Sequence, residues 1–123
     1  MRFKFKIWIE TEEGKPLIGK GGVKLLRAIE DTGSISSASK SVGVSYKFAW
    51  EYIKRINEIL GDSVEMRKGG KNAGGSKVNE KIDKLLSVYE EAQKEISEIL
   101  EKYNKKINEL FNEEEKKVNN NLF

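Results

Sequence analysis

The sequence contains no cysteine, no histidine and only one proline. Without cysteine and histidine the chain cannot form a disulfide, bind a metal through thiolate or imidazole groups, or build a catalytic triad that needs either residue. It also has no apolar run near the roughly 18 residues needed to span a bilayer. These absences exclude several classes of enzyme and of metalloprotein. We therefore expect no catalytic residue, no metal site and no cofactor.

The first ten residues, MRFKFKIWIE, alternate charged and apolar side chains, unlike the apolar centre of a secretory signal peptide. This favours a cytoplasmic protein with no membrane partner. The same alternation has the period of two typical of a strand, with Phe3, Phe5, Ile7 and Ile9 on one face. After the turn TEEGK, the segment KPLIG can pair back as a short second strand, and Pro16 at its start suits a sheet edge.

Charge is unevenly distributed along the 123 residues. Residues 1–79 carry 15 Lys and Arg against 9 Asp and Glu, a net charge of +6, whereas residues 80–123 carry 8 against 11, a net charge of −3. The length suits one domain with an extended appendage. A basic front half favours a polyanionic partner, although a merely solvated basic surface is the alternative.

Three short helical patterns follow the strands: GKGGVKLLRAIEDTGS, SISSASKSVGVS and YKFAWEYIKRINEILG. A glycine closes each pattern, Ser34 or Ser36 can cap the second helix, and Ser45 can cap the third. Two short helices joined by a tight turn predict a helix-turn-helix. The predicted inward faces are Val23, Leu26 and Ile29, then Ala38 and Val42, then Ala49, Ile53, Ile56 and Leu60.

The stretch MRKGGKNAGGSK lies between the possible strands SVEM and SKV. A helix-turn-helix followed by a hairpin is the winged-helix layout, so we interpret this stretch as a basic wing whose glycines let the backbone approach a partner closely. A nucleotide-phosphate loop is the alternative. It is disfavoured because no Gly-Lys-Ser/Thr closes the run and no strand-loop-helix unit surrounds it.

A long helix is predicted from Glu80, with Asn79 as its cap. Its apolar residues alternate three and four apart, which is a heptad pattern, and so small a head cannot cover so long a stripe. A partner helix from a second copy is the simplest cover. The predicted dimer seam consists of Ile82, Leu85, Tyr89, Ala92, Ile96, Ile99 and Tyr103.

Three motifs carry a resemblance to a known family: GSIS before the second helix, GVSYK.AW entering the third, and GGK..GG in the wing. Together they resemble the DNA-binding domain of ModE-type, molybdate-responsive transcription regulators, and more distantly the winged heads of LysR-type regulators. The resemblance covers about residues 1–80. It implies a winged head, dimerisation through the long helix, and Ser45, Tyr46 and Lys47 at the groove-facing start of a recognition helix.

The chain departs from that family in two places. Phe48 stands where members often have a small polar residue, so we expect a different target sequence. The molybdate-binding domains of full-length members have no counterpart in these residues, so we expect no identifiable molybdate site here.

The expected fold is mainly α with small β, in two domains. Residues 1–79 form a winged helix-turn-helix DNA-binding domain, and residues 80–123 form a long, coiled-coil-like dimerisation helix. The expected function is that of a sequence-specific, double-stranded DNA-binding transcription regulator, a homodimer located at the nucleoid and not an enzyme. The predicted base contacts are Ser45, Tyr46 and Lys47. The predicted phosphate contacts are Ser34, Ser36, Lys54, Arg55, Arg67, Lys68, Lys71 and Lys77.

Several alternatives stay open at this point. The serines could serve only as caps, and Phe48, Trp50 and Tyr52 could stack on single-stranded bases, although the core spacing of Trp50 favours packing. An architectural, nucleoid-type protein with little sequence preference would need the same basic surface. A coiled-coil adaptor whose head binds other proteins is the third possibility.

Overall fold

The computed structural model describes residues 1–66 and 75–121, with side chains described up to residue 112. The chain divides into two compact units, one formed by Ile7–Val88 and the other by Met1–Lys6 with Tyr89–Phe123. We call the first the head and the second the tail. The fold is mainly α with a small sheet, as predicted. The expected division into functional domains at residues 79 and 80 stays a prediction.

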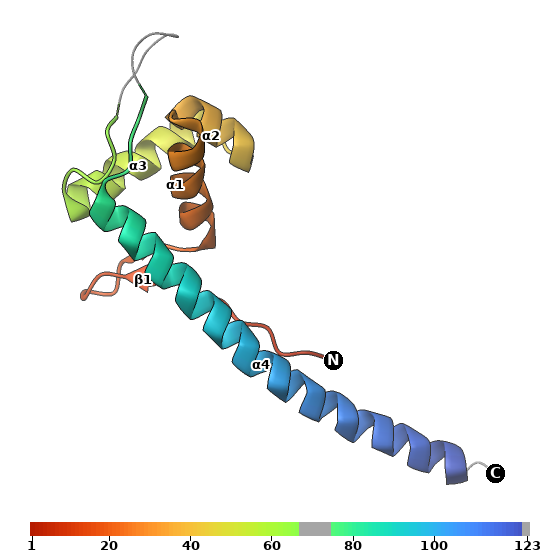
Figure 1. Cartoon of the computed structure of the whole chain (residues 1–123). Coiled ribbons are helices and arrows are strands. Elements are labelled where there is room, and N and C mark those ends of the chain that lie inside the picture. The colour runs from red at the N-terminus through yellow and green to blue at the C-terminus, as the bar shows by residue number, and fades with distance from the viewer. Residues whose placement is uncertain (67–74, 122–123) are drawn as a thin grey trace. The chain divides into compact units, whose positions relative to one another are not determined.

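Three helices form most of the head: α1 (Lys20–Thr32), α2 (Ile35–Val42) and α3 (Tyr46–Leu60) (Figure 1). Gly33 and Gly43 end α1 and α2 with positive φ angles of 74° and 78°, a conformation that glycine adopts without steric cost. The tight turn at Gly43 joins α2 to α3 and forms the helix-turn-helix that the sequence predicts.

Serine hydroxyls begin the second and third helices. Ser34 Oγ accepts the Ser37 N–H at 2.9 Å, and Ser45 Oγ accepts the Phe48 N–H at 3.0 Å. Each bond satisfies one N–H group that the helix itself cannot pair. Both caps are confirmed, and Ser34 rather than Ser36 caps α2.

The core of the head is made by the apolar faces of these helices. Leu26 and Ile29 of α1 and Ala38 of α2 are fully buried, as are the predicted α3 residues Ala49, Ile53 and Ile56. Leu60 was expected to continue the stripe, and this expectation is wrong, because its side chain is 41% exposed. It is the last residue of α3, next to the terminating Gly61, so no further turn of the helix follows it.

The small sheet pairs β1 (Ile9–Glu10) with β2 (Pro16–Ile18) in antiparallel register. The second strand is where the sequence predicts it. The first was expected over residues 2–10 and is wrong in extent, because the partner strand is only three residues long and pairs with residues 9 and 10 alone. The predicted alternation is nevertheless visible: Phe5, Ile7 and Ile9 are half-buried, whereas the residues between them are exposed.

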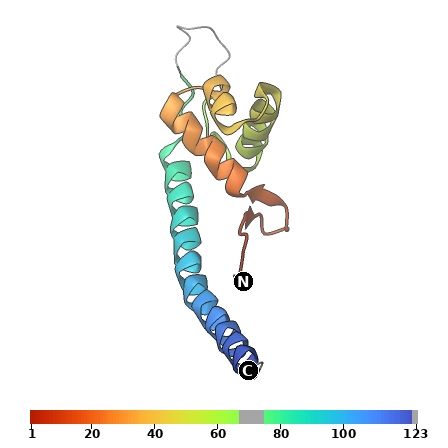
Figure 2. The same cartoon turned by 90° about the vertical axis from the view of Figure 1, so that its right-hand side faces the viewer.

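The segments on either side of residues 67–74 run side by side in Figures 1 and 2. Val64 and Val78 form an isolated antiparallel bridge, and the Glu65 N–H donates to the Lys77 carbonyl at 2.9 Å. We call residues 63–66 and 75–78 the wing base. The expected pair of strands is therefore reduced to one bridge, and the expected wing tip lies outside the described residues.

The wing base is fastened to the turn between α1 and α2. The Ser76 N–H donates to the Gly33 carbonyl at 2.7 Å. The backbones come so close that a methyl group on Gly75 would collide with the Gly33 carbonyl oxygen. Glycine is therefore needed at position 75 for a packing reason.

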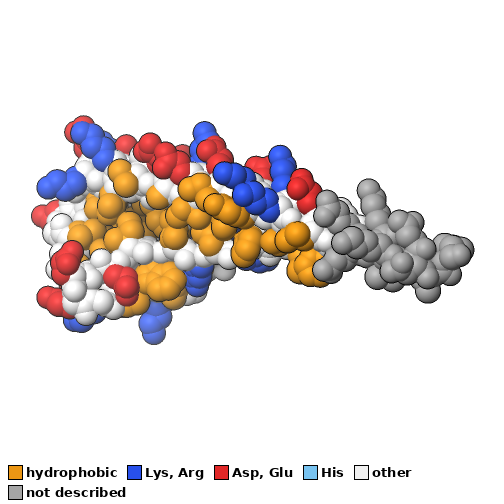
Figure 3. All heavy atoms as spheres, turned by 90° about the horizontal axis from the view of Figure 1, so that it is seen from below, with side chains coloured by type: hydrophobic (Ala, Val, Ile, Leu, Met, Phe, Trp, Pro, Cys, Tyr) orange, Lys and Arg blue, Asp and Glu red, His pale blue; other side chains and the backbone are white. Residues whose placement is uncertain are grey.

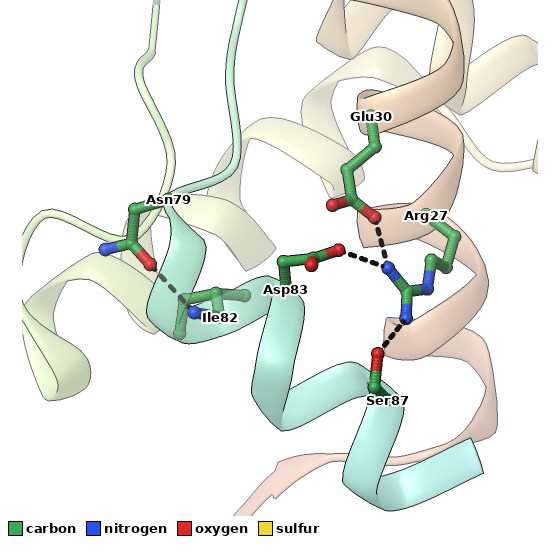
Figure 4. A network of polar contacts seen from close by, with 6 residues as sticks. All are labelled: Arg27, Glu30, Asn79, Ile82, Asp83 and Ser87. Carbon is green, nitrogen blue, oxygen red and sulfur yellow. Dashed lines mark hydrogen bonds and ion pairs between the residues drawn. The ribbon is translucent and has the colours of Figure 1, made fainter. Parts of the chain in front are cut away.

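The long helix α4 (Glu80–Asn121) begins in the head, where Asn79 Oδ1 accepts the Ile82 N–H at 2.8 Å and confirms the predicted cap. Arg27 of α1 joins its first turns, as Figure 4 shows. The Arg27 guanidinium lies 2.6 Å from Asp83 Oδ1, 2.7 Å from Glu30 Oε1 and 3.0 Å from Ser87 Oγ. Burial and the neighbouring Asp83 raise the pKa of Glu30, whereas hydrogen bonds from Glu30 and Arg27 lower the pKa of Asp83.

In the tail, the first residues of the chain lie along α4. The Phe3 N–H donates to Asn104 Oδ1, and the N-terminal ammonium group of Met1 donates to Asn108 Oδ1 at 3.3 Å. Figure 3 shows apolar side chains on the surface of the narrow part of the molecule, with charged side chains along one edge of them. The exposed large apolar residues of the tail are Met1, Phe3, Ile99, Tyr103, Leu110 and Phe111.

Candidate nucleic-acid interface

The start of α3 gathers the three residues predicted to contact bases. Ser45 is the cap, and Tyr46 and Lys47 occupy the first turn with exposed side chains. The Tyr46 ring lies 6.0 Å from the Trp50 ring, which holds it on the surface of the helix. The N-terminal turn of a helix is the part that reaches base edges in a helix-turn-helix complex, so the geometry permits the predicted role.

The solvent face of α3 carries three cations, Lys47, Lys54 and Arg55, interspersed with Glu51 and Glu58. An α-helix turns by about 100° per residue, so Lys47 and Lys54 lie opposite the buried Ala49, Ile53 and Ile56. Lys54 is exposed, and so is Arg55 on the flank of this face. These positions suit contacts with a phosphate backbone on either side of a groove.

The sequence predictions did not include Glu51 and Glu58 among the site residues. They line a shallow hollow of about 360 Å³ on α3 together with Phe48, Tyr52, Lys54 and Arg55. The sequence marks Phe48 as a departure from the family and as a possible stacking residue for single-stranded bases, and in the structure it stacks on Tyr52 with ring centroids 6.5 Å apart. The spacing of four residues between the two rings was a signal available in the sequence.

The other predicted phosphate contacts divide into three groups. Ser34 caps α2 and is half-buried, and Ser36 is exposed in the first turn of that helix. Lys77 is exposed in the wing base, which is bound to Gly33 next to the start of α2. The structure thus brings Ser34 and the wing base together. Arg67, Lys68 and Lys71 lie outside the described residues.

The predicted seam residues differ in burial. Ile82 is 3% exposed and belongs to the core of the head, and Tyr89 is also buried within the chain. Leu85, Ala92 and Ile96 are half-buried, whereas Ile99 and Tyr103 are exposed at 57% and 43%. The residues available to a partner therefore lie toward the C-terminal part of the predicted seam.

Metal-binding clusters and membrane-spanning helices are both absent from the described part of the chain. Among the side chains that the structure describes, in residues 1–66 and 75–112, no group of three or more acidic residues could hold a metal ion. In the same part of the chain, no helix is long and apolar enough to cross a membrane.

Three features together define the class of the head. They are the helix-turn-helix formed by α2 and α3, the exposed lysines and arginine on α3, and the wing base, whose two segments pair in antiparallel orientation. This is the arrangement of winged-helix proteins. No family model matches the chain.

Curated proteins with similar sequences indicate which winged-helix proteins the chain resembles. The chain is similar to the transcriptional regulator ModE of Haemophilus influenzae, with 39% identity over 69 residues, covering 55% of this chain and 27% of the relative. It is similar to the molybdenum-pterin-binding protein MopB of Rhodobacter capsulatus, with 37% identity over 84 residues, or 68% of this chain and 31% of the relative. It is also similar to the DNA-binding transcriptional dual regulator ModE of Escherichia coli K12, with 36% identity over 69 residues, or 55% and 26%.

The predicted resemblance to ModE-type regulators is therefore confirmed. The chain spans between about a quarter and a third of the length of these relatives. Their names describe regulators and a binding protein rather than enzymes, in keeping with the absence of catalytic residues expected from the sequence.

Proposed function

We propose that this protein is a sequence-specific, double-stranded DNA-binding transcription regulator that acts as a homodimer at the nucleoid. The observation that carries the proposal is the exposed face of α3, where Lys47 and Lys54 lie opposite a fully buried apolar stripe. An isolated basic face could serve any polyanion. Similarity to proteins named as transcriptional regulators, one of them as DNA-binding, supports duplex DNA as that polyanion.

In this proposal the position of each residue determines whether it contacts bases or phosphates. Ser45, Tyr46 and Lys47 contact base edges in the major groove, because they form the cap and the start of the first turn of α3. Cations farther along the helix and in the wing neutralise phosphates and set the affinity, which makes binding salt-dependent. The proposed phosphate contacts are Ser34, Ser36, Lys54, Arg55, Arg67, Lys68, Lys71 and Lys77.

The tail supplies the pairing of two heads. Ile99 and Tyr103 are exposed apolar residues at heptad spacing, and their burial against α4 of a second copy removes them from water. A two-fold pair of heads meets two half-sites about one helical turn, or a multiple of it, apart on DNA. The proposal assigns no molybdate site to the residues of this chain.

The test is selection of bound molecules from a random-sequence duplex pool at physiological salt, followed by sequencing. A regulator of this kind enriches a two-fold-symmetric motif that it binds on the order of a thousandfold more tightly than bulk DNA. Lys47→Ala should relax the preference for part of that motif, whereas Lys68→Ala with Lys71→Ala should weaken binding to all sequences and flatten the salt dependence.

Two other results would contradict the proposal in different ways. Tight, steeply salt-dependent binding with no enriched motif would indicate an architectural DNA-binding protein. No binding even at low salt would indicate an adaptor whose head contacts other proteins.

A further inference from the structure

Phe48 is the most exposed large apolar residue of α3. Its side chain is 57% exposed, and it lies in the first turn of the helix directly after Lys47. It is turned about 100° from Ala49, so it lies well outside the buried stripe. A large apolar side chain on the face that meets DNA in the proposed function adds affinity if it packs against an apolar group there.

Phe48 is held in place by a fixed ring. The Tyr52 hydroxyl donates to the Leu17 carbonyl of β2 at 3.1 Å, and burial raises the pKa of Tyr52 to about 12. A methyl group on Gly22 would collide with this hydroxyl, so the glycine leaves the space that Tyr52 occupies. The Phe48 ring stacks on Tyr52 with an interplanar angle of 14°. Phe48 is thus a supported ring rather than a loose surface side chain.

Cations lie beside this ring, in a hollow that Glu51 and Glu58 also line. The Arg55 guanidinium lies over the same Tyr52 ring, 5.5 Å from its centroid, and Lys47 and Lys54 are exposed on the adjoining face. An apolar ring with cations beside it is complementary to a surface on which an apolar group lies between anions. In the major groove of DNA the apolar group is the C5 methyl of thymine, and the anions are the phosphates on both sides of the groove.

We infer that Phe48 is a specificity-determining residue that packs against the C5 methyl group of a thymine in each half-site, and that Tyr52 is the positioning residue that aims it. This inference deepens the proposed function and rests on it. Apolar contact with the thymine methyl distinguishes thymine from cytosine, which carries an amino group and no methyl in the major groove.

The experiment removes the methyl groups from the DNA without changing base pairing. A duplex retained in the selection is made with each thymine replaced in turn by deoxyuridine, and dissociation constants are measured by fluorescence anisotropy for the wild type and for Phe48→Ala. Burial of one methyl group corresponds to about a fourfold change in affinity. We expect one replacement per half-site to weaken wild-type binding about fourfold, and the same replacement to leave Phe48→Ala unaffected.

Two further variants separate this contact from general effects. Ile59→Ala removes another exposed apolar side chain of α3 that does not line the hollow, and it should keep the full sensitivity to the methyl group. Tyr52→Phe removes the bond to Leu17 and should reduce the sensitivity while keeping the affinity for the deoxyuridine duplex. Circular dichroism checks that each variant is folded.

The outcomes distinguish the inference from the proposed function. Equal sensitivity of wild type and Phe48→Ala to every replacement overturns the inference alone, as does a wild type that ignores all of them. An equal loss of affinity by Phe48→Ala on thymine and deoxyuridine duplexes also overturns it, because the ring would then be a general contact. A wild type that binds no duplex overturns the proposed function and the inference together.

Discussion

The head and the tail both contain apolar residues at helical spacing on α4, but the burial of these residues differs between the two units. Leu86 lies in the first turns of α4 and is fully buried, whereas Ile99 and Leu110 lie on the same helix and are 57% and 61% exposed. In the head, Leu86 is covered by the rest of the chain. In the tail, Ile99 and Leu110 remain on the surface. Periodicity therefore identifies a face that needs covering, and it does not tell what covers the face.

The largest expected effect comes from a matched pair of leucines on α4. Leu86→Ala should lower the free energy of unfolding by about 2–5 kcal/mol, because it leaves a cavity in the core of the head. Leu110→Ala removes the same atoms from a site that is exposed in the single chain, and at a protein concentration too low for self-association it should change this free energy by less than about 0.5 kcal/mol. Urea denaturation of both variants measures the difference. Equal losses would mean that the tail is as well packed as the head.

The next effect concerns the exposed apolar residues of the tail, which a second copy of the chain covers in the proposed function. Ile99→Asp places a charge in the proposed seam and should weaken self-association by about tenfold or more, because a carboxylate is costly to bury without a partner. Ser97→Asp adds the same charge two residues away, off the seam, and should leave association unchanged. Sedimentation equilibrium gives the mass of each variant. An unchanged mass for Ile99→Asp would rule out pairing through this face.

A smaller effect depends on pH and separates the two carboxyls at the junction of α1 and α4. The pKa of Glu30 is raised in the folded state, so its contribution to stability is fully present below its ordinary value of 4.5 and is lost as pH rises through the folded pKa. The pKa of Asp83 is lowered, so its contribution is present above its ordinary value of 3.8 and is lost as pH falls through the folded pKa.

The stability difference between the wild type and Glu30→Gln should therefore change with pH in the opposite direction to the difference between the wild type and Asp83→Asn. The advantage of the wild type over Glu30→Gln should grow as pH falls toward 4.5. Its advantage over Asp83→Asn should shrink as pH falls below 3.8. Urea midpoints across this range measure both differences. Parallel curves for the two variants would show that the carboxyls share one environment.

The smallest effect compares three serines. Ser34→Ala and Ser45→Ala should each cost about 1 kcal/mol of stability, because each hydroxyl accepts a helix N–H. The exposed Ser36 does not cap α2, and Ser36→Ala should cost less than about 0.5 kcal/mol. Thermal unfolding of the DNA-free protein ranks the three. A large loss at Ser36 alone would mean that the cap has been assigned to the wrong serine.

The parts of the fold that depend on local chemistry were predicted well. Helix caps at Ser34, Ser45 and Asn79 follow from hydrogen bonds that span three residues. The expected strand over residues 2–10 failed because a strand needs a partner, and the alternating pattern says nothing about the length of that partner. The exposure of Leu60 was missed for a similar reason, since packing across elements decides it.

The candidate site was predicted in part. The start of α3 could be placed from the turn and the cap that precede it. The support of Phe48 could not, because it depends on Leu17 and Gly22, which lie far from Tyr52 in the sequence and meet it only in the folded head. The Arg27 contacts with Asp83 and Ser87 join residues at least 56 positions apart and left no local signal.

In the proposed function, the heads bind DNA and the tails pair the heads. Sedimentation velocity of the wild type can be measured with two duplexes, one carrying both half-sites of the selected motif and the other carrying a single half-site. Two chains should bind the first duplex, with an affinity that far exceeds the affinity for the second duplex and falls with Ile99→Asp. One chain per duplex, or equal affinity for the two duplexes, would overturn the pairing of heads by tails.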